Sequence, residues 1–209
     1  MRLFALLLLA NAATGAGAAE LFDRPADRTT VEQALSEPIG VLRRATVVRA
    51  RFEQARHLSG FGHPLTSSGE MLFVRGTGIV WRVLEPFDST SVFDRNGMRS
   101  GDGQAGPAPA AALRVLSGVL LSMLDLDVAA LESRFEMFTS ARSAGWILGL
   151  RPRDPGVADF AERMTISGRA TLEHIELRDA RGDRTEITFR DVTTAGGPAT
   201  PRDLAPFEP

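Results

Sequence analysis

Few residues of this chain could act in metal or acid–base chemistry. The three histidines are His57, His63 and His174. The first two flank a glycine-rich loop and could meet, but two histidines form no metal site without carboxylate neighbours. His174 stands beside Glu173 and Glu176 in an alternating segment, which is typical of a surface strand. The histidines therefore favour solvated side chains, and we expect no metal site.

Motifs for covalent or phosphate chemistry are also missing from the sequence. It has no cysteine nucleophile and no Gly-x-Ser-x-Gly elbow, and the Gly-Asp-Gly at 101–103 is too short and too acidic for a phosphate loop. Asp125 and Asp127 end a predicted helix, where the helix dipole disfavours carboxylates. Such a placement can be functional, but two acids in a loop are usually solvated. We therefore expect neither an enzyme nor a cofactor.

Arg75 stands out among the polar residues because its strand neighbours are apolar. Period-two alternation places it on one face of a predicted sheet with Met71, Phe73, Ile79, Trp81 and Val83. A buried arginine must be paired or hydrogen-bonded, since an unpaired buried charge is costly. Its five donors could hold backbone carbonyls at the C-terminal end of the helix predicted at Ala110–Leu126 and keep that helix in place as a lid. The alternative is an Arg75 that reaches solvent at the end of its strand, and the residues alone do not decide between the two.

Two predicted strands position these side chains. Gly69–Arg75 and Ile79–Leu84 flank a tight Gly76-Thr77-Gly78 turn, whose glycines tolerate the positive φ of a short hairpin loop. Large apolar side chains occupy positions where a polar strand would carry charge. This pattern indicates a curved sheet whose concave side holds apolar material.

Further strands follow the same alternation, and short helices precede or interrupt them. Strands are predicted at Thr46–Arg56, Ser89–Asp94, Leu131–Thr139, Gly145–Arg151, Met164–Ser167, Ala170–Leu177 and Arg184–Phe189. Turns are predicted at Asn96-Gly97 and Asp179–Asp183, and short helices at Val31–Leu35, Ile39–Arg44 and Val157–Arg163.

The segment Ala110–Leu126 predicts a longer helix after a flexible linker, Gly101–Pro109. Its other faces are almost as apolar as its main stripe, so it should be buried on more than one side. The stripe consists of Leu113, Leu116, Leu120 and Leu124. A movable lid would have this composition, although an ordinary core helix is the simpler interpretation. With the strands, this helix predicts a mainly β (α+β) fold, an incomplete antiparallel β-barrel (half-barrel) with a helical lid or plug.

The stretch from Val48 to Gly97 carries a series of short motifs. It contains Phe52-Glu53-Gln54, then a glycine, an acid and an apolar run ending in Arg75, then Trp81, and then a bend at Glu85-Pro86. In this order the motifs resemble the periplasmic outer-membrane lipoprotein carriers, the LolA-like family. Arg75 falls on the family's arginine and Trp81 on its tryptophan. The family's arginine is usually followed by proline, where this chain has Gly76.

The resemblance implies carriage instead of catalysis. It implies an apolar cavity that shields the acyl chains of a lipoprotein or other lipid, and a lid that the arginine holds shut. The partners would be an inner-membrane exporter and an outer-membrane acceptor. One alternative is a carrier or sensor of a non-protein lipid, such as a glycolipid or a lipid-linked pigment precursor. Another is an envelope interaction module whose cavity is filled by its own side chains. A monomer is expected, and the net charge of −2 argues against nucleic acid.

The two ends of the chain differ in composition from the predicted half-barrel. Arg2, the apolar Leu3–Ala10 and the small-residue Ala12–Ala19 have the three parts of a secretory signal peptide; the alternative is an uncleaved membrane tether. We expect residues 1–19 to be removed, residues 20–195 to form the domain, and the proline-rich residues 196–209 to be an extended, mobile tail. Without cysteine, neither a disulfide nor a lipid anchor forms, so we expect a soluble periplasmic protein.

The signal peptide gives a direct prediction. Mass spectrometry of the exported protein should find an N-terminus at Ala19 or Glu20, in the soluble fraction. A chain that keeps Met1 and sediments with membranes would contradict cleavage.

Overall fold

The computed structural model describes residues 21–36, 40–94, 97–100, 109–125, 127–140 and 145–208. Within the helix at 109–125, side chains are described at positions 115, 117–123 and 125. The predicted signal peptide at 1–19, linker residues 101–108 and Asn96 of a predicted turn lie outside these ranges.

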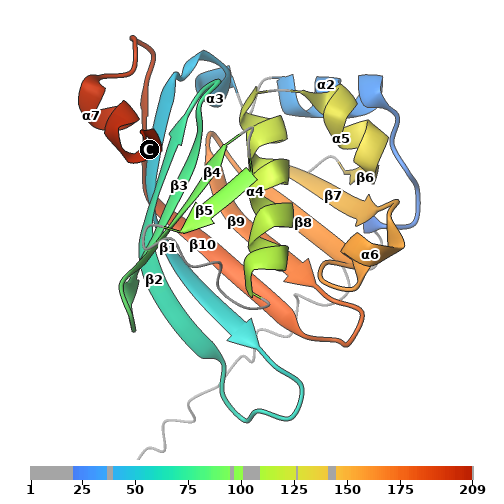
Figure 1. The fold of residues 1–209 in the computed structure, drawn as a ribbon. Coiled ribbons are helices and arrows are strands. Elements are labelled where there is room, and N and C mark those ends of the chain that lie inside the picture. Colours follow the sequence, from blue (N-terminus) through green and yellow to red (C-terminus); the bar gives the residue numbers. More distant parts are fainter. Residues whose placement is uncertain are drawn as a thin grey trace, which may run out of the picture.

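The described chain is built around one curved antiparallel sheet (Figure 1). Its 10 strands run in the order β5-β4-β3-β2-β1-β10-β9-β8-β7-β6, so that two meanders meet where β1 pairs with β10. The strands are β1 (Val47–His57), β2 (Leu65–Val74), β3 (Gly78–Glu85), β4 (Ser89–Asp94), β5 (Gly97–Ser100), β6 (Phe135–Thr139), β7 (Trp146–Pro152), β8 (Arg163–Gly168), β9 (Leu172–Arg178) and β10 (Arg184–Ala195). The sheet does not close on itself, which confirms the predicted half-barrel.

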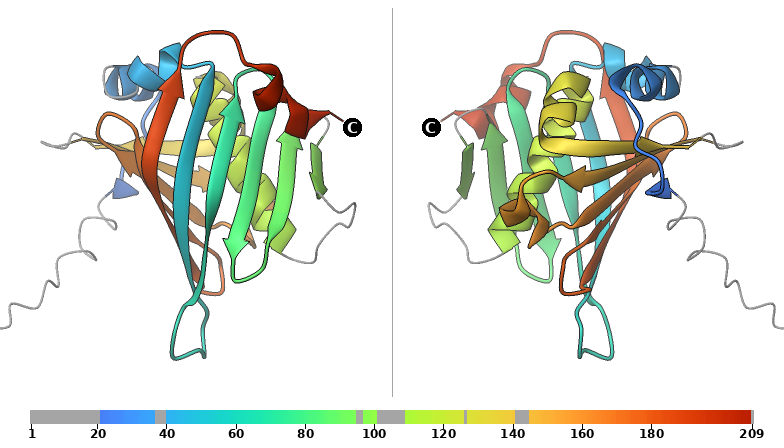
Figure 2. Two further views of the ribbon diagram at one scale, coloured as in Figure 1. Left: turned by 90° about the vertical axis from the view of Figure 1, so that its left-hand side faces the viewer. Right: turned by 90° about the vertical axis from the view of Figure 1, so that its right-hand side faces the viewer.

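One long helix, α4, lies across the concave face of this sheet (Figure 2). The helices are α2 (Arg28–Ser36), α3 (Gly40–Arg44), α4 (Pro109–Asp125), α5 (Val128–Arg134), α6 (Pro155–Ala158) and α7 (Pro201–Leu204), followed by the 3₁₀ turn η1 (Ala205–Phe207). Helices α2, α3 and α5 gather at one end of the half-barrel, near the C-terminal end of α4 (Figure 1). None of the helices in the described ranges is long and apolar enough to span a membrane.

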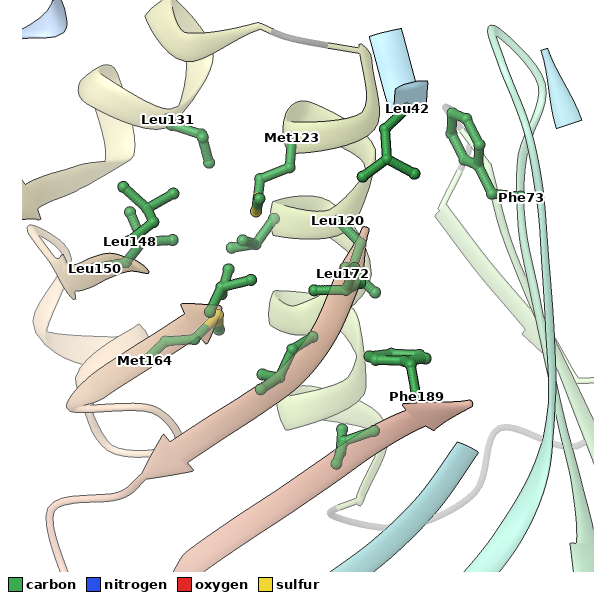
Figure 3. Close-up of a cluster of buried hydrophobic side chains, with 14 of the residues drawn as sticks. Leu42, Phe73, Leu120, Met123, Leu131, Leu148, Leu150, Met164, Leu172 and Phe189 are labelled. Atoms are coloured by element: carbon green, nitrogen blue, oxygen red, sulfur yellow. The ribbon is translucent and has the colours of Figure 1, made fainter. Parts of the chain in front are cut away.

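The main core fills the space between the concave face and the helices (Figure 3). Alternation of the strands produces it, because every second side chain of β2 and β3 points inward. Leu120 and Met123 of α4 lie among side chains from the opposite wall, such as Leu148 and Leu172. Leu120 and Leu148 are at most 1% exposed, so helix and sheet share one packed interior.

Trp81 is held within this interior by two phenylalanines. Its ring stacks on Phe52 with centroids 4.0 Å apart, and meets Phe189 edge-on at 6.1 Å. Gly69 makes room for this stack, since a Cβ there would lie 2.7 Å from the Phe52 ring and 1.9 Å from the carbonyl oxygen of Arg82. The glycine that opens the strand motif is therefore required by packing.

Two sequence predictions near the helices were wrong. The predicted strand Leu131–Thr139 is half helix, since α5 ends at Arg134 and β6 begins at Phe135. The helix forms because the Asp127 carboxylate caps it, accepting a hydrogen bond of 2.8 Å from the backbone N–H of Ala130. The predicted helix Val157–Arg163 ends sooner, at Ala158 of α6, and Arg163 already opens β8.

The C-terminal segment was predicted to be extended, but it folds back onto the convex face as α7 and η1. Thr200 and Asp203 form a reciprocal capping box at the start of α7. Asp203 also pairs with Arg49 of β1, and Arg99 of β5 donates to the carbonyls of Pro206 and Glu208 at 3.2 and 2.9 Å. The prolines concealed this helix from sequence analysis, although proline at a first helical position is favourable.

The capping box predicts a pH-dependent contribution to stability. Hydrogen bonds from the backbone N–H and the hydroxyl of Thr200, with the charge of Arg49, hold the pKa of Asp203 below its usual value. The ionised form is thus stabilised by folding, and its contribution is present above the unfolded-state pKa and lost as pH falls through the lowered native one.

Asp203→Asn should accordingly lower the thermal unfolding midpoint at pH 7, and the difference from wild type should shrink as pH falls below about 4 and disappear once pH is below the lowered native pKa of Asp203. Thermal denaturation followed by circular dichroism between pH 2 and 7 measures it. The exposed Asp159, replaced by Asn, is the control. A deficit that persists at acid pH would contradict this role of the charge.

Candidate functional site

Arg75 lies at the end of β2 and is fixed there by backbone and side-chain hydrogen bonds. Its N–H donates to the carbonyl of Thr46 at 2.8 Å. In the side chain, Nε donates to the carbonyl of Ala45 and a terminal nitrogen to that of Leu42, both at 2.8 Å. The guanidinium carbon also lies 5.8 Å from the ring centroid of Phe73. Arg75 therefore satisfies the last carbonyls of α3 and the corner leading into β1.

These carbonyls are not the ones expected from the sequence, which were at the end of the Ala110–Leu126 helix. The difference follows from strand register. Val47 pairs with Val74, so that the α3–β1 corner lies directly beside Arg75, and the carbonyls of Leu42 and Ala45 are the acceptors within its reach.

The link from Arg75 to α4 runs through the Asp125 carboxylate. The second terminal nitrogen of Arg75 is 3.6 Å from Oδ1 of Asp125, and the two side chains are 27% and 34% exposed. A partly exposed ion pair contributes about 0–1 kcal/mol, whereas each hydrogen bond from a charged donor contributes about 1.5–3 kcal/mol. Arg75 is thus firmly attached to the sheet and only lightly attached to α4.

The glycine after Arg75 has a conformational reason. Gly76 has φ +72° at the tip of the β2–β3 hairpin, and the turn is closed by a 3.0 Å bond from Thr77 N–H to the carbonyl of Val74. Proline, whose φ is fixed near −65°, cannot take this conformation. Glycine in place of the family's usual proline therefore suits this turn, and Arg75 reaches its acceptors.

The predicted apolar face is assembled as a continuous surface. Met71, Phe73, Ile79 and Trp81 are at most 3% exposed and belong to the main core, with Val83 partly buried against it. Of the predicted helix stripe, Leu120 is buried at 1% exposure. The side chains of Leu113, Leu116 and Leu124 lie outside the described residues.

Several members of this surface were not predicted as site residues. Val119 and Met123 of α4 are buried in the core, as are Phe52, Leu172 and Phe189 from the sheet. The alternation of their strands was a usable signal for Phe52 and Phe189. Asp125 was noted as an acid at a helix end, but its partner could not be inferred without the register of β1 and β2.

A hollow adjoins the C-terminal end of α4. It has a volume of about 290 Å³ and lies between α2, α3, α4 and α5. Leu35, Met123 and Leu131 line its apolar part, while Glu32 and Arg43 stand at its polar part. Open space therefore remains between these four helices in the described part of the chain.

The histidines do not form the pair considered from sequence. His63 is exposed in the β1–β2 loop, whereas Nε2 of His57 lies 3.1 Å from Glu186. His174, Glu176 and Glu186 place ligand atoms within 4.8 Å of one another on the convex face, at one side of a hollow of about 770 Å³.

Arginines already pair with both carboxylates of this cluster. Arg178 bonds to Glu176 at 2.6 Å, and Arg184 lies 3.3 Å from Glu186. We therefore interpret the cluster as ion pairs within β9 and within β10 on the outer surface, away from the concave face.

Comparison with known proteins gives a family match. The profile described as "Outer membrane lipoprotein carrier protein LolA" matches residues 43–200. A comparison with curated proteins found no match.

Several solved structures have a similar arrangement at low identity. A LolA superfamily protein from Nitrosomonas europaea is 8% identical, with 85% of this chain and 97% of that one covered and a TM-score of 0.46. A putative outer membrane lipoprotein-sorting protein domain from Vibrio parahaemolyticus is 9% identical, with 86% and 96% covered and a TM-score of 0.43. MucB in the Pseudomonas aeruginosa MucA/MucB complex is 14% identical, with 85% of this chain and 60% of that one covered and a TM-score of 0.45. At these identities and scores the structures add no argument to the family match.

The contacts of Arg75 give a prediction that separates its two attachments. Asp125→Asn removes the ion pair, so hydrogen exchange of the last turns of α4 should rise by about 1.4- to 5-fold, the equivalent of about 0.2–1 kcal/mol. The end of α3 should be unaffected. Arg75→Leu removes the ion pair and both side-chain hydrogen bonds to the carbonyls of Leu42 and Ala45. Exchange should therefore rise at the end of α4 and, by about ten-fold or more, at the α3–β1 corner.

Hydrogen exchange with mass spectrometry measures both segments in one experiment. Arg82→Leu is the matched control, because Arg82 belongs to the same β2–β3 hairpin as Arg75. It pairs with Asp88 and contacts no helix carbonyl in the described chain. Wild-type exchange of α4 in both Asp125→Asn and Arg75→Leu would show that Arg75 does not hold this helix.

Proposed function

Since the chain belongs to the family of the outer membrane lipoprotein carrier protein LolA, we propose that it is a periplasmic carrier without catalytic activity. It shields acyl chains of a lipoprotein, or of another lipid, on the concave face of the half-barrel. The cargo comes from an inner-membrane exporter and passes to an outer-membrane acceptor, the partners that the family resemblance implies.

The observation that carries the proposal is the continuous apolar surface shared by α4 and the sheet. Leu120 and Met123 cover the same surface that Phe73 and Leu148 form on the two walls (Figure 3). An acyl chain is chemically equivalent to these side chains, and each buried methylene contributes about 0.8 kcal/mol. A ligand that replaces α4 thus exchanges one set of apolar contacts for another, and binding needs no covalent chemistry.

Arg75 fits this exchange as a latch for the lid. Its anchor on the α3–β1 corner keeps the guanidinium in place, while the light contact to Asp125 lets α4 leave and return. Re-formation of the contact would favour release of the cargo. Losing Arg75 should therefore allow loading and slow transfer to the acceptor.

The alternatives retain the fold and differ in what occupies the concave face. A carrier or sensor of a non-protein lipid would use the same surface for a glycolipid or a lipid-linked pigment precursor. An envelope interaction module would keep the surface filled by its own side chains. The complete burial of Phe73, Ile79 and Leu148, each 0% exposed in the described chain, is compatible with the module as well as with a closed carrier.

Trp81 offers a test of the carrier. It is 3% exposed and stacked on Phe52, so that acyl chains replacing α4 must change its surroundings. In a protein with Trp146→Phe, which leaves Trp81 as the sole tryptophan, titration with a long-chain alkyl probe should shift its emission saturably. An emission spectrum that is indifferent to saturating probe would indicate a permanently closed core and favour the module.

Native mass spectrometry of the purified protein then distinguishes the cargoes. A co-purifying lipid mass supports a carrier, and an adduct with a lipid-modified protein identifies a lipoprotein cargo. A clean ligand-free mass favours the interaction module.

A further inference from the structure

The indole of Trp146 carries a buried donor without an acceptor. Trp146 is 3% exposed, and its Nε1 has no hydrogen-bond partner in the described chain. Buried tryptophan N–H groups usually have a partner, because an unpaired buried donor costs free energy. Nε of Arg99 shares this condition, but the other nitrogens of Arg99 bond to the carbonyls of Pro206 and Glu208. The single donor of Trp146 has no such compensation.

Trp146 belongs to the concave surface described above. It opens β7, and with Leu148 and Leu150 it alternates inward into the main core. Its cross-strand neighbour on β8 is Gly168, which pairs in turn with Leu172 of β9. No side chain therefore stands beside the indole at the neighbouring position of β8.

The backbone enforces this glycine. A Cβ on Gly168 would lie 1.9 Å from the carbonyl oxygen of Thr171, and one on Gly145, which has φ +143°, would lie 2.4 Å from the carbonyl oxygen of Gly168. The neighbouring backbone thus lies too close for a side chain at either Gly145 or Gly168. The surroundings of Trp81 are different, because the rings of Phe52 and Phe189 pack against its indole.

We infer that the Trp146 N–H donates a hydrogen bond to the carbonyl oxygen that joins an acyl chain to its head group. This inference rests on the proposed function and names the polar contact within it. Indole Nε1 can only donate, so its partner must be an acceptor. A hydrocarbon chain has none, whereas the ester of an acylated glycerol or the amide of an N-acylated peptide supplies a neutral oxygen that tolerates an apolar site.

Such a donor would make the cavity selective for acyl over alkyl chains. A site built to hydrogen-bond a ligand group discriminates against the analogue that lacks the group, because the buried partner is then left unpaired. The ring of Trp146 would supply apolar contact to both ligands, and its N–H would recognise one of them.

The test compares ligands that differ in this carbonyl. Dioleoylglycerol is paired with its dialkyl ether analogue, and an N-palmitoyl peptide with the N-hexadecyl peptide of the same sequence, measured above the pKa of its secondary amine so that both peptides carry the same charge. Wild type should bind each carbonyl ligand about 2- to 12-fold more tightly than its partner, the ratio of one net hydrogen bond. Trp146→Phe keeps a ring and removes the donor, so the preference should vanish while affinity for the ether ligand changes little. Trp81→Phe, the matched control, should keep the preference.

Nuclear magnetic resonance observes the same bond directly. The chain has 2 tryptophans, so two indole N–H signals are expected, and Trp146→Phe assigns them. The Trp146 signal should move downfield with the ester and not with the ether. A preference shown by the glycerol pair alone identifies the ester as the acceptor, and one shown by the peptide pair alone identifies the amide.

The possible failures are distinct. Equal affinity of wild type for the two members of both pairs, or a preference that persists in Trp146→Phe, would overturn this inference and leave the carrier standing. Failure of all four ligands to bind would overturn the proposed function together with the inference.

Discussion

The fold depends on one constraint: an open, curved sheet with an apolar concave face must have that face covered. The strands bury inward side chains from both meanders, and the sheet does not close on itself. Helix α4 provides the cover with Val119, Leu120 and Met123. Because hydrophobic burial is non-directional, an acyl chain in the place of the helix would cover the same face. The property that stabilises the domain therefore supports the proposed binding of acyl chains.

Polar contacts determine where that cover is attached. Arg75 connects the α3–β1 corner to the C-terminal end of α4, with its stronger bonds on the side of the sheet. On the opposite face, the Asp203 capping box and its pairing with Arg49 keep α7 against the strands. The cover on the convex face is thus held by several charge-assisted contacts, whereas among the described residues α4 is held by apolar packing and by the light ion pair of Asp125 with Arg75. This asymmetry is consistent with a lid on the concave side.

Much of the fold could be predicted from sequence because strand alternation is a local signal. The hairpin around Gly76, the inward face of Met71 to Val83 and the long helix all follow from residue periodicity. The acceptors of Arg75 could not be predicted, since they depend on β1 lying next to β2. Helix α5 was missed because Asp127 was considered a solvated acid and not a cap, and the C-terminal helix because its prolines indicated extended chain. The unpaired N–H of Trp146 leaves no trace in sequence, since it becomes apparent only from the surroundings of the indole.

The most direct test of exchange between α4 and ligand is the distance between α4 and the sheet. The chain has no native cysteine, so spin labels can be placed on Cys introduced at Ser122 of α4 and Arg178 of β9. Pulsed electron resonance should show the distance between the labels increasing when a saturating acyl ligand is added, and returning when the ligand is removed. A ligand that binds while this distance stays unchanged would contradict the exchange of α4 for cargo.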